Sequence, residues 1–159
     1  MTGSIVRRHM SEFEVRLFED DASIVSIGEG LLSATLSREA WTHEAHLAAC
    51  SWLVRARGDI DTERELPLII AAYNAAVGEV NDDTRGYHHT ITQVYIAGVK
   101  AHLAEVGHDL PLYAAVNALL LSERGSRDLP LRFYSKERLF SVQARRTFVA
   151  PDRLSLKHI

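Results

Sequence analysis

The feature that most constrains the fold is a series of apolar segments with helical periodicity, several of them followed by a glycine. In DTERELPLIIAAYNAAVG, for example, apolar side chains recur every three to four residues before Gly78. Glycine commonly ends helices because it adopts the left-handed conformation of a C-terminal cap without strain. No segment alternates apolar and polar residues between hairpin turns, as a half-buried strand does. The sequence therefore predicts an all-α protein, a single compact bundle of about five to six helices.

Capping residues give approximate bounds for these helices. Ser37 is the predicted N-cap of the second helix, and Gly58 is its predicted left-handed C-terminal cap. The start of the third helix stays open, because Thr62 and Glu65 have capping-box spacing while Pro67 equally suits a first turn. The predicted helices cover residues 22–34, 38–57, a segment ending near 77, 86–106, 110–124 and 135–147.

Composition limits the class of protein. The 159 residues and the 47% apolar fraction suit one domain with its own core, so we expect residues 11–159 to form a single helical domain. Residues 1–10, MTGSIVRRHM, are expected to be a loose leader or a tag remnant. The net charge of −3 offers nucleic acid no basic surface, and no apolar run approaches the roughly 18 residues of a membrane span. We therefore expect a cytoplasmic bacterial protein, monomeric or homodimeric, that binds neither nucleic acid nor membrane.

Two histidines share one general face of the second predicted helix, SREAWTHEAHLAACSWLVRARG. At about 100° per residue, Glu44, Ser51 and Arg55 form a narrow polar stripe, which we expect to face solvent. His46 lies opposite that stripe, and His43 lies one turn earlier. The pattern predicts two interior imidazoles from one helix.

A third histidine occupies the apolar face of the fourth predicted helix. In GYHHTITQVYIAGVKAHLAEV, His88 lies among apolar side chains and His89 turns toward solvent. If the second and fourth helices are antiparallel neighbours, His43, His46 and His88 meet. Two imidazoles at i, i+3 and a third from a facing helix suit Zn²⁺, Fe²⁺ or Ni²⁺ with an open coordination position. A divalent transition metal held by these three residues is therefore one hypothesis for a cofactor, and otherwise no cofactor is expected.

A structural role for the same histidines stays open. A buried imidazole is commonly satisfied by a backbone carbonyl, a tyrosine hydroxyl or a buried water. A metal-free acid/base pocket is the third alternative. The segment THEAH is not the HExxH motif of zinc proteases, because its second histidine comes one residue early.

Aromatic, amide and guanidinium side chains are candidates for binding a small-molecule ligand. Aromatic rings would shape a pocket, an amide would orient the ligand, and a guanidinium would hold a carboxylate or phosphate. An exposed helix-end amide and interhelix salt bridges are the alternative roles. The candidates are Trp41, Tyr73, Asn74, Tyr87, Arg132 and Arg138.

Four segments together resemble a known family. They are WTHEAHLAA, YNAAVGEVND, GYHHTITQ and YSKERLFSVQARRTFVAPD, in this order, and the resemblance runs from about residue 31 to about residue 151. They resemble an uncharacterised family of small all-α bacterial proteins with WTHxxHL and GYHxTIT motifs. The first motif contains His43 and His46, and the second contains His88, with His89 at its variable position. The resemblance supports the choice of these residues and implies no activity.

The functional hypotheses depend mainly on the three histidines. The first is a metal-assisted or acid/base enzyme that acts on a small molecule in a His-lined interior pocket. The alternatives are a non-catalytic module that binds an organic anion through Arg132 or Arg138, and a structural module with core histidines. Neither the reaction nor the substrate follows from the residues.

Overall fold

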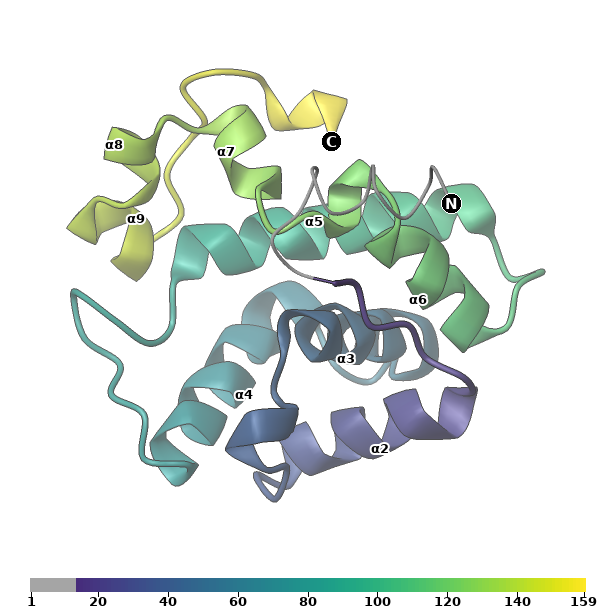
Figure 1. Cartoon of the computed structure of the whole chain (residues 1–159). Helices are drawn as coiled ribbons and strands as arrows, with labels where there is room; N and C mark the ends of the chain where they lie inside the picture. The colour runs from purple at the N-terminus through teal and green to yellow at the C-terminus, as the bar shows by residue number, and fades with distance from the viewer. Residues whose placement is uncertain (1–13) are drawn as a thin grey trace.

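The computed structural model describes residues 14–159, and over this range every regular element is helical (Figure 1). The prediction of an all-α fold is confirmed. The predicted leader, residues 1–10, lies outside the described residues. Among the helices described, none has the length and apolar character needed to cross a membrane. The elements are α2 Asp21–Leu32, η1 Arg38–Ala40, α3 His43–Ala56, α4 Thr62–Ala76, α5 His89–Val106, α6 Leu112–Leu120, η2 Glu123–Gly125, α7 Leu129–Phe133, α8 Lys136–Leu139, α9 Val142–Arg146 and η3 Leu156–His158.

Helix α3 is central and has almost no exposed face. It packs against α2, α4, α5 and α6, and every residue from 47 to 53 is buried. The predicted solvent-facing stripe is therefore wrong, since Glu44 is 5% exposed and Ser51 0%. The Ser51 hydroxyl donates to the Leu47 carbonyl oxygen at 2.7 Å, so the helix itself satisfies it. The amphipathic pattern failed because four neighbouring helices leave α3 no solvent side.

Helix α5 connects two hydrophobic clusters. Figure 1 shows it crossing the molecule between α2–α4 on one side and α7–α9 on the other. Ile96 and Val99 belong to the larger cluster, which is built with α2, α3, α4 and α6. Val94 belongs to a smaller cluster with residues of the segment 129–149, and Tyr95 packs against both clusters.

The second predicted helix is interrupted just before α3. Ser37 caps only η1, where its Oγ accepts the Ala40 N–H at 3.3 Å. Trp41 then takes φ −83° and ψ 63°, which is not helical. Thr42 starts the helix again, because its Oγ1 accepts the Ala45 N–H at 3.1 Å. This break places the Trp41 side chain beside the first turn of α3.

Two other predicted helix ends also differ. Helix α4 is capped by Asp61, whose Oδ1 accepts the Arg64 N–H at 3.3 Å and whose own N–H donates to the Glu65 carboxylate at 2.5 Å. Neither Thr62 nor Pro67 therefore caps the start, and Pro67 lies inside the helix. Gly58 does not take the predicted left-handed conformation, because α3 already ends at Ala56 with Arg57 as its cap.

The last two predicted helices are shorter than expected. Helix α6 stops at Leu120, and the predicted tail helix is divided into α8 and α9. Ser135 and Ser141 accept the N–H groups of Arg138 and Ala144 at 3.2 and 3.1 Å. Each serine caps a separate helix. The tail therefore forms two short helices where periodicity alone predicted one continuous helix.

Candidate functional site

A pocket of about 570 Å³ lies at the N-terminal end of α3. The break before α3 supplies one side of it, and residues 14–16 supply another. Phe18 holds this N-terminal segment to α6, because its N–H and its carbonyl oxygen bond the Asn117 side chain at 2.8 Å each. The lining residues are Glu14, Val15, Arg16, Trp41, Thr42, His43, Glu44 and Arg127.

The His43 imidazole has a defined orientation in this pocket. Its Nε2 lies 2.8 Å from the carbonyl oxygen of Gly125. Because a carbonyl oxygen only accepts, Nε2 carries the proton and Nδ1 keeps its lone pair. The ring edge also contacts Tyr95, at 5.6 Å between centroids and 71° between planes. Tyr95 is held in turn by its hydroxyl, which donates to the Ser126 carbonyl oxygen at 2.6 Å.

The Nδ1 atom of His43 keeps its lone pair. It has no hydrogen-bond partner among residues 14–159. Over that same range no fully buried side-chain nitrogen or oxygen lacks a partner, so this nitrogen is not completely buried. Burial of the rest of the ring lowers the pKa of His43, opposed by the hydrogen bond to Gly125 and assisted by the nearby Arg127 charge. The ring is therefore a neutral acceptor at neutral pH.

His46 supports the wall of the pocket. Its Nδ1 donates to the Thr42 carbonyl oxygen at 2.6 Å, which ties the ring to the start of its own helix. The ring stacks on Trp41, with centroids 3.7 Å apart and 27° between planes. Trp41 also meets Tyr73 edge-on at 5.5 Å. Desolvation lowers the pKa of His46 to about 4, so this ring stays neutral and holds the indole in place.

Glu44 and Arg127 form an ion pair at the pocket. Their side chains are 7% and 41% exposed, and the Oε2 to guanidinium nitrogen distance is 3.6 Å. The pair therefore presents its positive partner to solvent and hides its negative partner. Sequence reasoning missed both residues. The helical periodicity put Glu44 on a solvent-facing side, and Arg127 lies in a loop, where periodicity gives no signal.

The structure shows no metal-binding group at His43, His46 and His88 in the described part of the chain, and the predicted metal site stays a prediction. No group of three or more His, Cys, Asp or Glu side chains among residues 14–159 is placed to hold a metal ion. His88 is the N-cap of α5, so its Nδ1 accepts the Ile91 N–H at 3.2 Å. Its Nε2 donates to the Leu139 carbonyl oxygen at 2.8 Å. With both ring nitrogens engaged, His88 satisfies the backbone and has no lone pair for an ion.

Two of the predicted ligand-binding residues stabilise α4. Tyr73 is buried, and its hydroxyl donates toward the carbonyl oxygens of Leu36 and Ser37 at 2.9 and 3.1 Å. It approaches the pocket only through its edge contact with Trp41. Asn74 donates to the Asn81 side chain at 3.1 Å and so fastens the loop after α4.

The other predicted ligand-binding residues lie elsewhere. The Tyr87 hydroxyl is 2.7 Å from His89 Nδ1, outside the pocket at α3. Arg132 is paired with the exposed Glu123 carboxylate at 2.8 Å. Arg138 donates to the Ala150 carbonyl oxygen at 2.5 Å. Of the six ligand-binding candidates, only Trp41 lines the pocket at α3.

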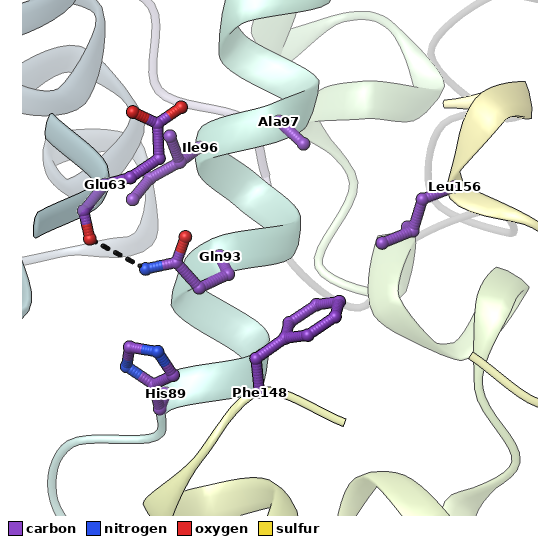
Figure 2. Close-up of a pocket in the computed structure, with 7 residues that line it drawn as sticks. All are labelled: Glu63, His89, Gln93, Ile96, Ala97, Phe148 and Leu156. Carbon is purple, nitrogen blue, oxygen red and sulfur yellow. Dashed lines mark hydrogen bonds between the residues drawn. The ribbon is translucent and has the colours of Figure 1, made fainter. Parts of the chain in front are cut away.

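A second pocket, of about 420 Å³, lies between the start of α4, α5 and the C-terminal segment. Figure 2 shows His89 and Gln93 on α5 facing this space, with Phe148 beside them. Gln93 already donates to the Glu63 carbonyl oxygen at 3.0 Å, and the Glu63 carboxylate pairs with Lys100. The polar groups that line this second pocket are thus largely engaged in hydrogen bonds or ion pairs, and apolar side chains complete the pocket walls. The pocket at α3 is the better candidate because it is lined by His43, whose Nδ1 keeps its lone pair.

The chain matches no protein-family model, no curated protein and no solved structure. The resemblance to the family with WTHxxHL and GYHxTIT motifs therefore stays a prediction.

Proposed function

We propose that this protein binds a small polar molecule in the pocket at the start of α3 and that His43 accepts a proton from it. The observation that carries the proposal is the hydrogen bond from His43 Nε2 to Gly125, which leaves Nδ1 as the nitrogen with a lone pair. A general base needs a lone pair within reach of its substrate and must be unprotonated at the working pH. Two observations support this role: the Nδ1 atom of His43 keeps its lone pair, and His43 lines the pocket.

The charges around His43 suit a base that is neutral at rest. Burial and Arg127 both lower the pKa of His43, so the lone pair is available at neutral pH. Once Nδ1 takes a proton, the Gly125 carbonyl oxygen and the Glu44 carboxylate stabilise the imidazolium. The positive charge that His43 gains with the proton is therefore compensated by these two groups.

A metal-assisted form of the site is the second candidate, and one observation favours it. His43 and His46 each donate one ring N–H to a backbone carbonyl, which is the arrangement found behind metal-binding imidazoles. Residues 14–159 place no third ligand beside them, so an ion would need ligands from a bound molecule or water. Metal analysis of protein purified without a His-tag separates the two forms. Less than about a tenth of an equivalent of metal, with no rise in melting temperature on adding Zn²⁺, Fe²⁺ or Ni²⁺, excludes the metal form.

Ligand titration of the wild type and H43Q tests the acid/base proposal. Glutamine keeps an N–H for the Gly125 carbonyl oxygen and removes the basic nitrogen. We expect a fragment library of small acids, alcohols and amines to yield compounds that shift the His43 ring-nitrogen signals and raise the melting temperature. H43Q should lose this effect, whereas H108Q should keep it, because His108 is exposed and away from the pocket. Compounds that bind H43Q as well as the wild type would contradict the proposal.

A further inference from the structure

The turn that follows η2 is held by side chains from two different helices. His43 on α3 donates to the Gly125 carbonyl oxygen at 2.8 Å. Tyr95 on α5 donates to the carbonyl oxygen of the next residue, Ser126, at 2.6 Å. The two rings also contact each other edge-on, with their centroids 5.6 Å apart. Two consecutive carbonyl groups and two neighbouring rings thus form one closed set of contacts between α3, α5 and the turn.

The two carbonyl groups of this turn depend on each other. A peptide group is planar, so only the φ and ψ angles of Ser126 connect the plane of the Gly125 carbonyl to the next peptide plane. Ser126 takes φ −67° and ψ 144°, an extended conformation. Its carbonyl oxygen accepts from Tyr95 and also from the Leu129 N–H, at 3.2 Å. Because the second plane is held in this way, the Gly125 carbonyl has little freedom to turn away from His43.

The Tyr95 side chain is a rigid and constant donor. Burial raises the pKa of Tyr95, and the nearby Asp128 carboxylate acts in the same direction, so the hydroxyl keeps its proton. The ring is fixed as well, because it packs against both hydrophobic clusters. The turn that orients His43 is therefore attached to a well-anchored part of α5.

From these contacts we infer that Tyr95 is a positioning residue for His43: through the turn at 125–126 it holds the Gly125 carbonyl oxygen against Nε2 and so keeps the proton on that nitrogen. The inference rests on the proposed function, because it names the residue that prepares the base of the same pocket. Tyr95 is not one of the residues that line the pocket, so it acts through His43 and not on a bound molecule.

The variant Y95F tests this inference, because phenylalanine keeps the ring and removes only the hydroxyl. The His43 nitrogen signals in a long-range proton–nitrogen NMR spectrum of the full chain report which ring nitrogen carries the proton. We expect the ratio of the Nδ1-protonated to the Nε2-protonated form to rise about threefold or more, the scale of one weakened hydrogen bond. A general loss of stability would not change this ratio in the folded protein.

The variant Y134F is the matched control. Tyr134 is a buried tyrosine whose hydroxyl likewise donates to a backbone carbonyl oxygen, that of Val149, at 2.6 Å. Its loss should lower stability and leave the His43 signals as they are in the wild type. Circular dichroism confirms that both variants are folded. If the ratio in Y95F equals that in the wild type, or if Y134F changes it as much as Y95F does, the inference is wrong.

The inference and the proposed function fail separately. The tautomer ratio is measured without any ligand, so it decides the role of Tyr95 even if no compound binds in the pocket. If H43Q abolishes ligand binding while Y95F leaves the ratio unchanged, the proposed function stands and Tyr95 has no positioning role.

Discussion

The His43 ring donates from Nε2 to the carbonyl oxygen of Gly125 at 2.8 Å, and these two residues are 82 positions apart in the chain. The contact links the first turn of α3 to the end of η2. Because it fixes which ring nitrogen carries the proton, a turn far away in the sequence decides the chemistry of His43. The predictions below concern this contact and the groups around it.

Adding a methyl group at position 125 should disturb the contact. A Cβ at Gly125 would lie 2.2 Å from the Leu119 carbonyl oxygen and 2.7 Å from the Leu120 Cα, so the backbone must move. We expect G125A to lose about 1–3 kcal/mol of unfolding free energy and to change the His43 ring signals. Urea unfolding and NMR measure the two effects. G58A is the control, since a Cβ at Gly58 meets nothing within 4 Å, and equal losses in both variants would contradict this view of the turn.

The cap of α3 should contribute to stability in a way that serine restores. Thr42 Oγ1 accepts the Ala45 N–H at 3.1 Å, and alanine at position 42 would leave that donor without its partner. T42A should cost about 1 kcal/mol of unfolding free energy, while T42S should cost much less. Thermal or urea unfolding measures both. A T42S protein as unstable as T42A would show that the Thr42 methyl group, and not the cap, matters.

Stability should depend on pH through His46. Its pKa is lowered from 6.5 to about 4 in the folded protein, chiefly by desolvation. Between those values the unfolded chain binds the proton more readily, so the unfolding free energy rises with pH across this window. The contribution of His46 is complete above about pH 6.5, falls as the pH drops, and is lost by about pH 4.

The variant H46F isolates this effect. Phenylalanine keeps a ring against Trp41 and cannot take up a proton, so its unfolding free energy should change less between pH 4 and 6.5. We expect the wild type to lose about 2 kcal/mol more than H46F over that range. Urea unfolding at four pH values measures the difference, and the comparison removes the contribution of acidic residues common to both proteins. Parallel pH profiles would contradict the role given to His46.

His88 should act on stability alone. Removing its ring leaves the Ile91 N–H and the Leu139 carbonyl oxygen without their side-chain partner. We expect H88A to lose about 2–3 kcal/mol of unfolding free energy, whereas H108A, at an exposed position, should stay within about 0.5 kcal/mol of the wild type. Ligand binding by folded H88A should be unchanged. A stable H88A protein that no longer binds ligand would contradict this prediction and show that His88 belongs to the functional site.

Some of the fold and part of the site follow from the sequence. The helical class follows from periodicity, and His43 and Trp41 follow from their place in WTHEAH. The break between η1 and α3 did not follow, because Ser37 and Thr42 are both good caps and periodicity cannot say that both are used. The role of His88 was missed for a related reason. A histidine at a helix start is itself able to cap, and the pairing of its other nitrogen with Leu139 depends on tertiary structure.

The contacts between distant segments were beyond sequence reasoning. Arg127 reaches Glu44 only because α6 and η2 return the chain to the start of α3. A buried glutamate was also unexpected, since carboxylates are rarely buried without a partner, and the partner lies in a loop. The sequence therefore identified the imidazole and the indole of the pocket and missed its ion pair.

The most direct measurement is the long-range proton–nitrogen NMR spectrum of the histidine rings, with His43 assigned by comparison with H43Q. If His43 is the acceptor described here, its Nε2 carries the proton at neutral pH, Nδ1 is bare, and protonation occurs only below the ordinary histidine pKa. A proton on Nδ1 at neutral pH, or titration at or above the ordinary value, would contradict the account.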